Sequence, residues 1–469
     1  MPSNASDLKR CVSEYIEANR EDYHRLSKAI WDKPELGMEE YEAHRLHTEF
    51  LKERGFSVES GVAGMPTAYV ATWGKGKPVI GFSAEYDALP GLSQNVTSSK
   101  DPVRASAPGQ GCGHNLIGVS AVLAAVSLKE TMLKGGLSGT VKVFGTPAEE
   151  LCIGKPFMGS QGVFDGLDLV LDWHPWAGSS VHYAGCPAYF NIKYHFSGRT
   201  AHGNAPWHGR SALDAAVLQA HAIELLREHY PPSPSVAAAH TINYTFSDTG
   251  PEFASVVPDR ATLWCIGRFS TAELLSDIID RVDKCAEGAA LATGTVVKKE
   301  YITASHEMLP NETVANVIYD NLIAAGDVVF TEDEKAFVAA MQKEEGQAPF
   351  WVEKTPQPPA SASIAVTDAA EYSWVAPYGI LLLNLGPGPG WHNWMVTACA
   401  GGSLGEKTLD KAAQVLSCSA VDFLLDDGLL QKAKTEWADK MKGRTYGSLL
   451  PADTPVPLDI NKSTMDKYR

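Results

Sequence analysis

Strand-like and helix-like segments alternate through the first third of this chain, and this alternation restricts the fold more than any other feature. Short apolar segments at 77–91, 139–150 and 166–176 each give way to polar residues. Between the first two lies the segment 114–133, "HNLIGVSAVLAAVSLKETML", whose length and apolar content are typical of a buried helix. Strands that alternate with helices in this way predict a parallel sheet with crossover helices.

A second pattern begins near Ala188, where the expected order becomes strand, helix, strand, strand, helix, strand. This is the order of a ferredoxin-like unit, and the α/β pattern resumes after it. We therefore predict an α/β fold class: a mixed, mostly parallel sheet with flanking helices, interrupted by an inserted ferredoxin-like α+β domain. The expected boundaries are 1–187 and 307–469 for the α/β domain and 188–306 for the insert. A chain of 469 residues is long enough for both.

The composition excludes several classes of partner. The formal net charge is −16, and the sequence lacks the basic surface that binding to nucleic acid or to an anionic membrane needs. The first residues hold no apolar signal core, and the longest apolar stretch, Leu116–Leu128, is too short to span a bilayer. Eight cysteines without a framework spacing favour reduced thiols. We therefore expect a cytoplasmic protein that acts on a small molecule, with no nucleic-acid or membrane partner.

Side chains that can bind metal ions follow several of the expected strands. The carboxyl ends of parallel strands meet at one edge of a sheet, where α/β proteins place their sites. Glu149 and Glu150 are adjacent, and neighbouring carboxylates repel each other unless a positive group lies near them. A lone histidine there would more often be a hydrogen-bonding group, but acids, imidazoles and a thiol together predict a site for zinc or a similar divalent ion. The set comprises Glu85, Asp87, Cys112, His114, Glu149, Glu150, Asp172, His174 and His392.

The order of short motifs from about Ile30 to Lys407 resembles that of a known enzyme family. The motifs are "WDKPELGMEE", "AEYDALPG", "GCGHN", "GTPAEE", "WHP", "SGRTAH" with "GRSALDA", and "HNWMVTACAGGSLGEK". They are similar to those of the metallo-amidohydrolases and peptidases that include carboxypeptidase G, aminoacylase and the auxin-conjugate hydrolases, and most of all to the p-aminobenzoyl-glutamate hydrolase branch. The resemblance implies a catalytic domain with two divalent metal ions, zinc or manganese, and an inserted lid that also forms a homodimer. It leaves room for a sister subunit.

The resemblance also implies roles for individual residues. Glu149 would be the general base. Asp87 would hold a ligand histidine through the ring nitrogen that faces away from the metal, which is a common requirement at zinc sites. The alternative role for Asp87 is that of a loop-capping carboxylate. The implied metal ligands are Cys112, His114, Glu150, His174 and His392.

Three positions depart from the pattern of the family. Glu85 stands where related sequences carry His or Asp, and its role stays open. Asn115 stands where the auxin-hydrolase branch usually has Asp, although the p-aminobenzoyl-glutamate branch also tolerates Asn. Ser255 occupies a place often held by Asn, which puts a substrate contact there in doubt.

The expected lid holds two candidate site residues. His202, in the lid motif at 197–215, would reach across a dimer to the partner's metal site and donate a hydrogen bond to the developing oxyanion. A turn histidine with local partners is the alternative. Arg268 is a candidate to clamp a substrate carboxylate through its planar guanidinium, with a salt bridge to a lid acid as the alternative. His195 and His208 are expected to be ordinary lid residues.

Tryptophans concentrate near the expected ligands. Indole rings on loops form a flat apolar wall on which aromatic groups stack, so Trp176 is a candidate substrate-binding residue, with core packing as the alternative. The segment 346–363 is expected to be a long ordered loop near the site, with disorder as the alternative. The tryptophans are Trp173 and Trp176 beside His174, Trp391 and Trp394 beside His392, and Trp351 and Trp374 before the last strand.

These observations predict a metal-dependent amidohydrolase that cleaves the C–N bond of a small N-acyl or N-aroyl amino acid or a related aromatic amide. The metal ions would polarise the carbonyl and acidify a water molecule, and Glu149 would take the proton of that water. Two alternatives stay open. A dipeptidase or aminopeptidase needs an acid that holds a free substrate amine, and the sequence identifies none. A non-catalytic metal-binding subunit would need Glu149 to be absent or displaced.

Overall fold

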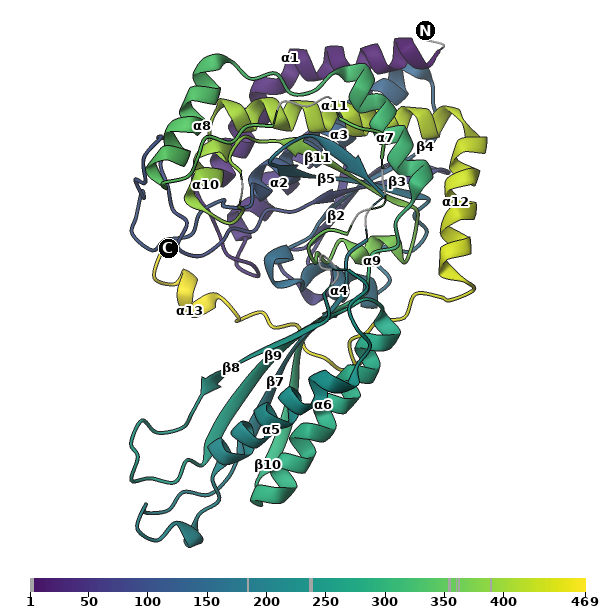
Figure 1. The fold of residues 1–469 in the computed structure, drawn as a ribbon. Helices are drawn as coiled ribbons and strands as arrows, with labels where there is room; N and C mark the ends of the chain where they lie inside the picture. Colours follow the sequence, from purple (N-terminus) through teal and green to yellow (C-terminus); the bar gives the residue numbers. More distant parts are fainter. Residues whose placement is uncertain are drawn as a thin grey trace.

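The protein has a broad domain built around a large sheet and a narrow domain that projects from one side of it (Figure 1). The two domains contain separate sheets, one of seven strands and one of four. The computed structural model describes residues 4–183, 185–235, 239–352, 356–359, 361, 363–388 and 390–469.

The large sheet is mixed. Its central strands run parallel in the order β4-β3-β5-β11, and antiparallel strands extend the sheet at both edges. Parallel pairing needs crossover connections, and α3 (His114–Gly135) connects β3 to β4. The prediction of a mixed α/β fold is therefore confirmed. The strands of this sheet are β1 (Ser57–Ser60), β2 (Tyr69–Lys75), β3 (Val79–Ala84), β4 (Gly139–Gly145), β5 (Leu169–Trp176), β6 (Ser180–His182) and β11 (Tyr378–Asn384).

Long helices cover one face of this sheet. α3 and α11 pack against the sheet and against each other, and α1 packs on both helices (Figure 1). By length and composition α3 could cross a membrane, but 83% of its most apolar window is buried inside this protein. The short helices α4 and α9 lie on the side of the domain that faces the lid. The helices are α1 (Ala5–Trp31), α2 (Tyr41–Glu53), α4 (Gly154–Ser160), α7 (Glu312–Ala325), α8 (Glu332–Glu344), α9 (Ala370–Ser373), α10 (Trp394–Ala400), α11 (Ser403–Leu425), α12 (Asp427–Met441) and α13 (Lys462–Met465).

The narrow domain, the lid, is an antiparallel sheet with two packed helices. Its strand order, β10-β7-β9-β8, is the ferredoxin-like topology that the sequence pattern predicts. Ala188, at the start of β7, pairs with Phe269 near the broad domain, whereas Ser197, at its end, pairs with Arg260. The loop that follows Ser197 therefore lies at the far end of the lid. The elements are β7 (Ala188–Ser197), α5 (Ala212–Leu226), β8 (Thr241–Asp248), β9 (Arg260–Phe269), α6 (Ala272–Thr293) and β10 (Val296–Ser305).

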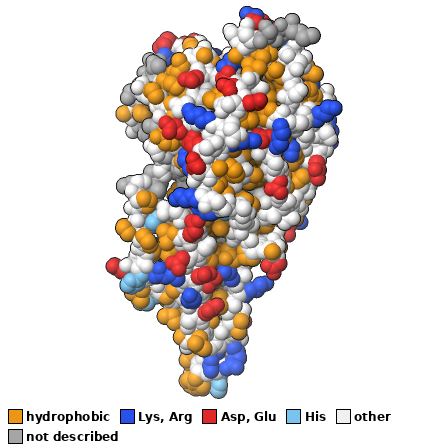
Figure 2. Space-filling view, turned by 90° about the vertical axis from the view of Figure 1, so that its right-hand side faces the viewer, with side chains coloured by type: hydrophobic (Ala, Val, Ile, Leu, Met, Phe, Trp, Pro, Cys, Tyr) orange, Lys and Arg blue, Asp and Glu red, His pale blue; other side chains and the backbone are white. Residues whose placement is uncertain are grey.

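The lid exposes large apolar side chains. Trp207 and Phe253, in the two loops at the far end, are 69% and 67% exposed, and Leu291 on α6 is 86% exposed. Figure 2 shows hydrophobic side chains along the tapered lower part of the molecule, with charged side chains between them. These side chains leave apolar area available for contact with another surface.

Two further features bear on the sequence predictions. All eight cysteines are free. The described residues of the segment 346–363 form no helix or strand, and Ser363 at its end forms an isolated bridge with Gly185. Residues 353–355, 360 and 362 of that expected loop lie outside the described part of the chain.

Candidate metal centre

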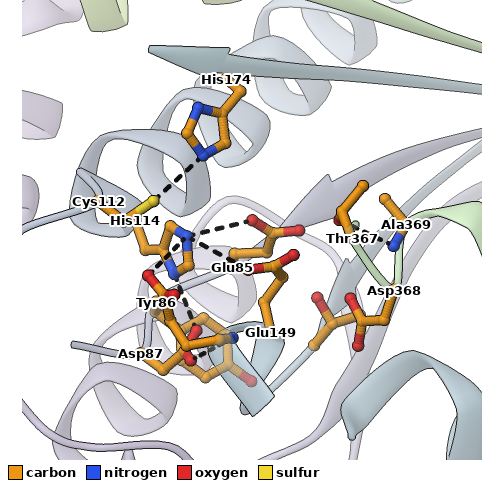
Figure 3. A network of polar contacts seen from close by, with 12 residues as sticks. Glu85, Tyr86, Asp87, Cys112, His114, Glu149, His174, Thr367, Asp368 and Ala369 are labelled. Atoms are coloured by element: carbon orange, nitrogen blue, oxygen red, sulfur yellow. Dashed lines mark hydrogen bonds and ion pairs between the residues drawn. The ribbon is translucent and has the colours of Figure 1, made fainter. Parts of the chain in front are cut away.

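The candidate ligands come together at the carboxyl ends of the parallel strands, and Figure 3 shows Cys112, His114 and His174 among them. Glu85 and Asp87 follow β3, the turn with Glu149 and Glu150 follows β4, and His174 lies near the end of β5. Strands that run parallel deliver their carboxyl ends to one edge, so residues far apart in sequence meet there. Cys112 and His114 reach the same edge at the start of α3, and His392 reaches it before α10.

Two groups of possible metal ligands share one thiol. Within each group the ligand atoms lie within 4.8 Å of one another. The Sγ atom of Cys112 lies 3.3 Å from Nε2 of His174, and Nε2 of His392 lies 3.4 Å from Oε2 of Glu150. The sharing of Cys112 places the two groups side by side, as a pair of metal ions requires. The groups are Cys112, His114 and His174, and Cys112, Glu150 and His392; a third group comprises Glu85, His114 and Glu149.

The polar atoms that face this space fit a cation. Nε2 of His114 and Oε1 of Glu150 are buried and have no hydrogen-bond partner among the described residues. Nδ1 of His114 lies 2.9 Å from Oδ1 of Asp87, and Nδ1 of His174 lies 2.7 Å from the carbonyl oxygen of Pro175. When these Nδ1 atoms carry the protons, both Nε2 lone pairs face the site, as metal coordination needs.

The electrostatics of the centre also favour a bound positive charge. Burial, with the nearby charge of Glu85, raises the pKa of Glu149 to about 7, and burial raises the pKa of Glu150 to about 8. Burial also raises the pKa of the Cys112 thiol well above its usual range and lowers the pKa of His174 to about 4. The histidine is therefore neutral and ready to coordinate, whereas the acids and the thiol need a cation to ionise fully at neutral pH.

A buried lysine that the sequence analysis missed belongs to this network. Nζ of Lys155, on α4, lies 2.7 Å from Oε1 of Glu85 and 2.5 Å from Oδ1 of Asp368. The Lys155 side chain is fully buried, and the pKa of its ammonium group is raised well above the usual range despite burial, because Asp368 and Glu85 are negative. A single lysine after the "AEE" motif does not reveal this pairing in the sequence, because Asp368 lies 213 residues further along the chain.

A cavity of about 570 Å³ opens beside the metal ligands. The broad domain contributes Trp176 and Trp391, whose rings lie 5.3 Å apart, and the lid contributes Tyr189 and Arg268. Trp176 is 45% exposed, so its ring is available to a ligand. Arg268 donates to Oδ1 of Asn243 at 3.3 Å and forms no ion pair with any described lid acid.

The aromatic wall is smaller than the sequence analysis expected. Trp173 lines the cavity but is almost fully buried. Three of the six tryptophans do not line this cavity, because they pack elsewhere. Trp394 donates to Glu345, the ring of Trp374 lies 4.3 Å from that of His306, and the ring of Trp351 lies 5.4 Å from that of Phe330.

His202 lies far from the metal ligands of its own chain. It is exposed in the loop at the far end of the lid, where it pairs with Val256 and its Nδ1 accepts a hydrogen bond from the backbone of Asn204 at 3.1 Å. Ser255 lies in the adjacent loop, and its carbonyl oxygen accepts from Gly203 at 2.7 Å. The Asn115 side chain is buried away from the cavity, where its amide donates to Ser27 at 3.0 Å.

The chain is similar to several known hydrolases. A family model described as the peptidase dimerisation domain matches residues 188–293. A p-aminobenzoyl-glutamate hydrolase subunit of Escherichia coli (strain K12) is 32% identical over 96% of this chain and 99% of its own length. An Xaa-Arg dipeptidase of Mus musculus is 28% identical over 93% of each chain. A Bacillus subtilis protein described as a dinuclear metal binding peptidase from the M20 family shares the fold, with a TM-score of 0.56 and 17% identity over 87% of this chain and 99% of that one.

The raised pKa values of the buried acids predict how the metal-free protein responds to pH. Glu149 and Glu150 keep protons in the folded chain at pH values where the unfolded chain, with an ordinary pKa of 4.5, has released them. The free energy of unfolding should therefore fall as the pH rises from 4.5 through about 8. Thermal unfolding of the metal-free protein across this range would show a falling Tm. Added zinc or manganese should restore the Tm most strongly at the upper end.

The double variant Glu149→Gln, Glu150→Gln is the control for this prediction. It removes both titrating groups, so the fall in Tm should become shallower. An unchanged slope in the double variant would mean that other groups carry the effect.

Proposed function

Because this chain belongs to the M20 peptidase family, we propose that it is a metal-dependent amidohydrolase, which cleaves the C–N bond of a small N-acyl or N-aroyl amino acid or a related aromatic amide. The observation that carries the proposal is the position of Glu149, which lines the cavity next to two ligand groups that share Cys112. A carboxylate beside a metal pair is what hydrolysis by an activated water needs.

Seven residues have assigned roles at the metal pair. Cys112, His114 and His174 would hold one divalent ion, and Cys112, Glu150 and His392 would hold the other. Asp87 would fix the ring of His114 through Nδ1. Zinc or manganese, when bound here, would supply Lewis-acid polarisation of the amide carbonyl and acidify a water molecule. Glu149 coordinates neither ion in this assignment and stays free for proton transfer.

Glu149 is the proposed general base. Its Oε2 atom lies 3.8 Å from Nε2 of His114, at the border between the ligands and the cavity. The carboxylate takes a proton from the attacking water as the water oxygen bonds to the amide carbon. It returns that proton to the amide nitrogen as the C–N bond breaks, so the products are a carboxylic acid and an amine. A positioned acid–base group contributes about 10²–10⁴-fold to the rate.

The cavity supports an aromatic substrate that carries a carboxylate. Trp176 and Trp391 offer a flat apolar surface, and Arg268 brings a guanidinium group from the lid. Aromatic stacking adds about 0.5–1.5 kcal/mol beyond the burial of area. The similarity to an aminobenzoyl-glutamate hydrolase supports the same substrate class.

We further propose that the active form is a homodimer. The match of residues 188–293 to a dimerisation domain and the exposed apolar residues of the lid support this. His202, at the far end of the lid, would then act at the partner's metal centre. The Escherichia coli relative is named as one of two different subunits of its hydrolase, which also supports a possible sister subunit here. A cytoplasmic location accords with eight free cysteines.

A dipeptidase is the second candidate function. The 28% identical Xaa-Arg dipeptidase and the carboxylate of Asp172 in the cavity wall favour it, since an acid can hold a basic or amino group of a peptide. However, both oxygens of Asp172 already accept hydrogen bonds, from the backbone of Trp173 at 2.8 Å and from the hydroxyl of Tyr378 at 2.9 Å. The amidohydrolase therefore remains the better-supported function.

The first prediction from this proposal separates the two adjacent glutamates. Glu149→Gln should retain both metal ions and lower kcat by at least about a hundredfold, because only proton transfer is lost. Glu150→Gln should lose metal, because a carboxamide is a poor ligand. Metal analysis of each purified variant beside steady-state kinetics checks both outcomes. Full metal content and near-normal rates in both variants would contradict the assignment.

The second prediction concerns His202. Chains that carry His202→Ala and chains that carry Glu149→Gln should each be inactive as homodimers, because each site lacks one group. Heterodimers purified through two different affinity tags should regain activity, since one of their two sites is complete. His208→Ala, in the same loop, is the matched control and should be active alone. Verified heterodimers without activity would place His202 in its own chain's function or outside catalysis.

The third prediction concerns the substrate. Benzoyl or 4-aminobenzoyl amino acids should have a higher kcat/KM than acetyl amino acids with the same side chain, and Trp176→Ala should reduce this preference. Arg268→Ala should raise KM about tenfold or more for the free acid, the size expected for a lost charged hydrogen bond, but not for the matching amino acid amide. A preference for acetyl substrates would rule out the aromatic site, and preferential cleavage of dipeptides would favour the second candidate function.

A further inference from the structure

The turn that carries Glu149 and Glu150 is strained at both ends. Ala148 and Cys152 have positive φ values of 55° and 53°, although neither is glycine. Non-glycine residues in this left-handed region are strained, and they keep this conformation only where the surrounding structure holds them there. The contacts that hold this turn therefore decide where the two glutamate side chains point.

One of these contacts comes from Glu40, a residue of the "WDKPELGMEE" motif for which the proposed mechanism has no role. Oε1 of Glu40 accepts a hydrogen bond from the backbone N–H of Ala148 at 2.8 Å, and Oε2 accepts from the hydroxyl of Thr67 at 3.0 Å. The Glu40 side chain is fully buried. On the other side of the turn, Oδ2 of Asp87 accepts from the N–H of Glu150 at 3.0 Å.

The local structure frees Glu40 for this contact. Glu40 occupies the N-cap position of α2, but its side chain caps no N–H group of that helix. Oε2 of Glu35 accepts from the N–H groups of Glu42 and Ala43 at 2.9 and 3.1 Å instead. Because Glu35 satisfies the first turn of the helix, Glu40 can point the other way, toward Ala148.

The loop that carries Glu40 also touches the turn directly. A Cβ atom added to Gly37 would lie 2.7 Å from Cβ of Ala148, so the backbones approach more closely than any other residue would allow. The same loop bonds to the segment after β3, because Ala88 donates to the carbonyl oxygen of Glu35 at 2.7 Å. The loop at 35–40 thus supports both segments that bring carboxylates to the metal centre.

We propose that Glu40 is a positioning residue, which holds the N–H of Ala148 and thereby keeps Glu149 and Glu150 directed into the metal centre. This inference rests on the proposed function for its effect on catalysis but not for its effect on the turn. Burial raises the pKa of the Glu40 carboxyl well above its usual range, so glutamine is a close mimic of its side chain.

The test compares Glu40→Ala with the conservative Glu40→Gln. In the metal-free protein, hydrogen exchange followed by mass spectrometry should show residues 145–153 exchanging about tenfold faster or more in the alanine variant, because an acceptor for a buried N–H is lost. The glutamine variant should exchange within about threefold of the parent, since its carbonyl oxygen still accepts. In the metal-loaded protein, the alanine variant should lose about tenfold or more in kcat, with a smaller change in KM.

Asp168→Ala is the matched control. Asp168 is also a buried carboxylate that accepts from a backbone N–H, that of Val79 at 2.7 Å, but it precedes β5 at the edge of the sheet opposite the metal centre. This variant should lower Tm and leave both kcat and the exchange of residues 145–153 unchanged. If Glu40→Ala does not fold, Glu40→Met is the second test, because it keeps the length of the side chain and removes both acceptor oxygens. Faster exchange at 145–153 in this variant would support the proposal, and unchanged exchange would overturn it.

Unchanged exchange at 145–153 and unchanged kcat in a folded Glu40→Ala protein would overturn the proposal, as would an equal loss of kcat in Asp168→Ala. Faster exchange at 145–153 in a protein whose parent cleaves no amide would support the role of Glu40 and reject the proposed function. The two ideas can therefore fail separately.

Discussion

Several carboxylates lie close together at the carboxyl ends of the parallel strands, and the electrostatic repulsion between them is the main constraint on this protein. Glu85, Glu149 and Glu150 all lie within 3.8 Å of the same imidazole nitrogen, Nε2 of His114. Burial and repulsion between carboxylates raise the pKa of Glu149 to about 7 and that of Glu150 to about 8, so these two acids need a cation to ionise fully at neutral pH. Lys155 balances Glu85 and Asp368, but Nε2 of His114 and Oε1 of Glu150 stay without partners among the described residues. Bound divalent ions would give both of these atoms a partner.

The fold gathers these groups through parallel strands and a strained turn. The strands β3, β4 and β5 end at one edge, and the turn after β4 holds its shape because buried carboxylates accept its N–H groups. Rigid support of this kind suits the proposed role of Glu149, since small displacements of a general base have large effects on rate. Stability and function are therefore coupled at the turn, where Ala148 is held in a conformation that an isolated peptide would avoid.

The lid contributes two side chains to the wall of the cavity beside the centre that the broad domain builds. Arg268 and Tyr189 bring one charge and one ring to the cavity, whereas the loop with His202 points to the opposite end of the lid. Cavity residues near the base of the lid and a histidine at its tip accord with the proposed homodimer, in which each tip would reach the other chain's centre. The apolar exposure of Trp207 and Phe253 at the tip fits the same arrangement.

The sequence by itself determined the fold class and the inserted domain and pointed to the candidate site, because periodicity and strand-end residues are local signals. It brought Glu85, Glu149, Glu150 and His174 together because the carboxyl ends of parallel strands must meet, whereas Cys112 and His114, at the start of α3, were assigned to the same site by the family resemblance. Only the tertiary structure decided which tryptophans face the cavity, since indole rings near a site and in a core look alike in sequence. It also revealed Lys155 and Glu40, whose partners lie 213 and 108 residues away along the chain. A buried polar group needs a hydrogen-bond partner, so each of these contacts fixes the side chain that makes it. Which groups are buried depends on the packed fold, and no local sequence pattern encodes it.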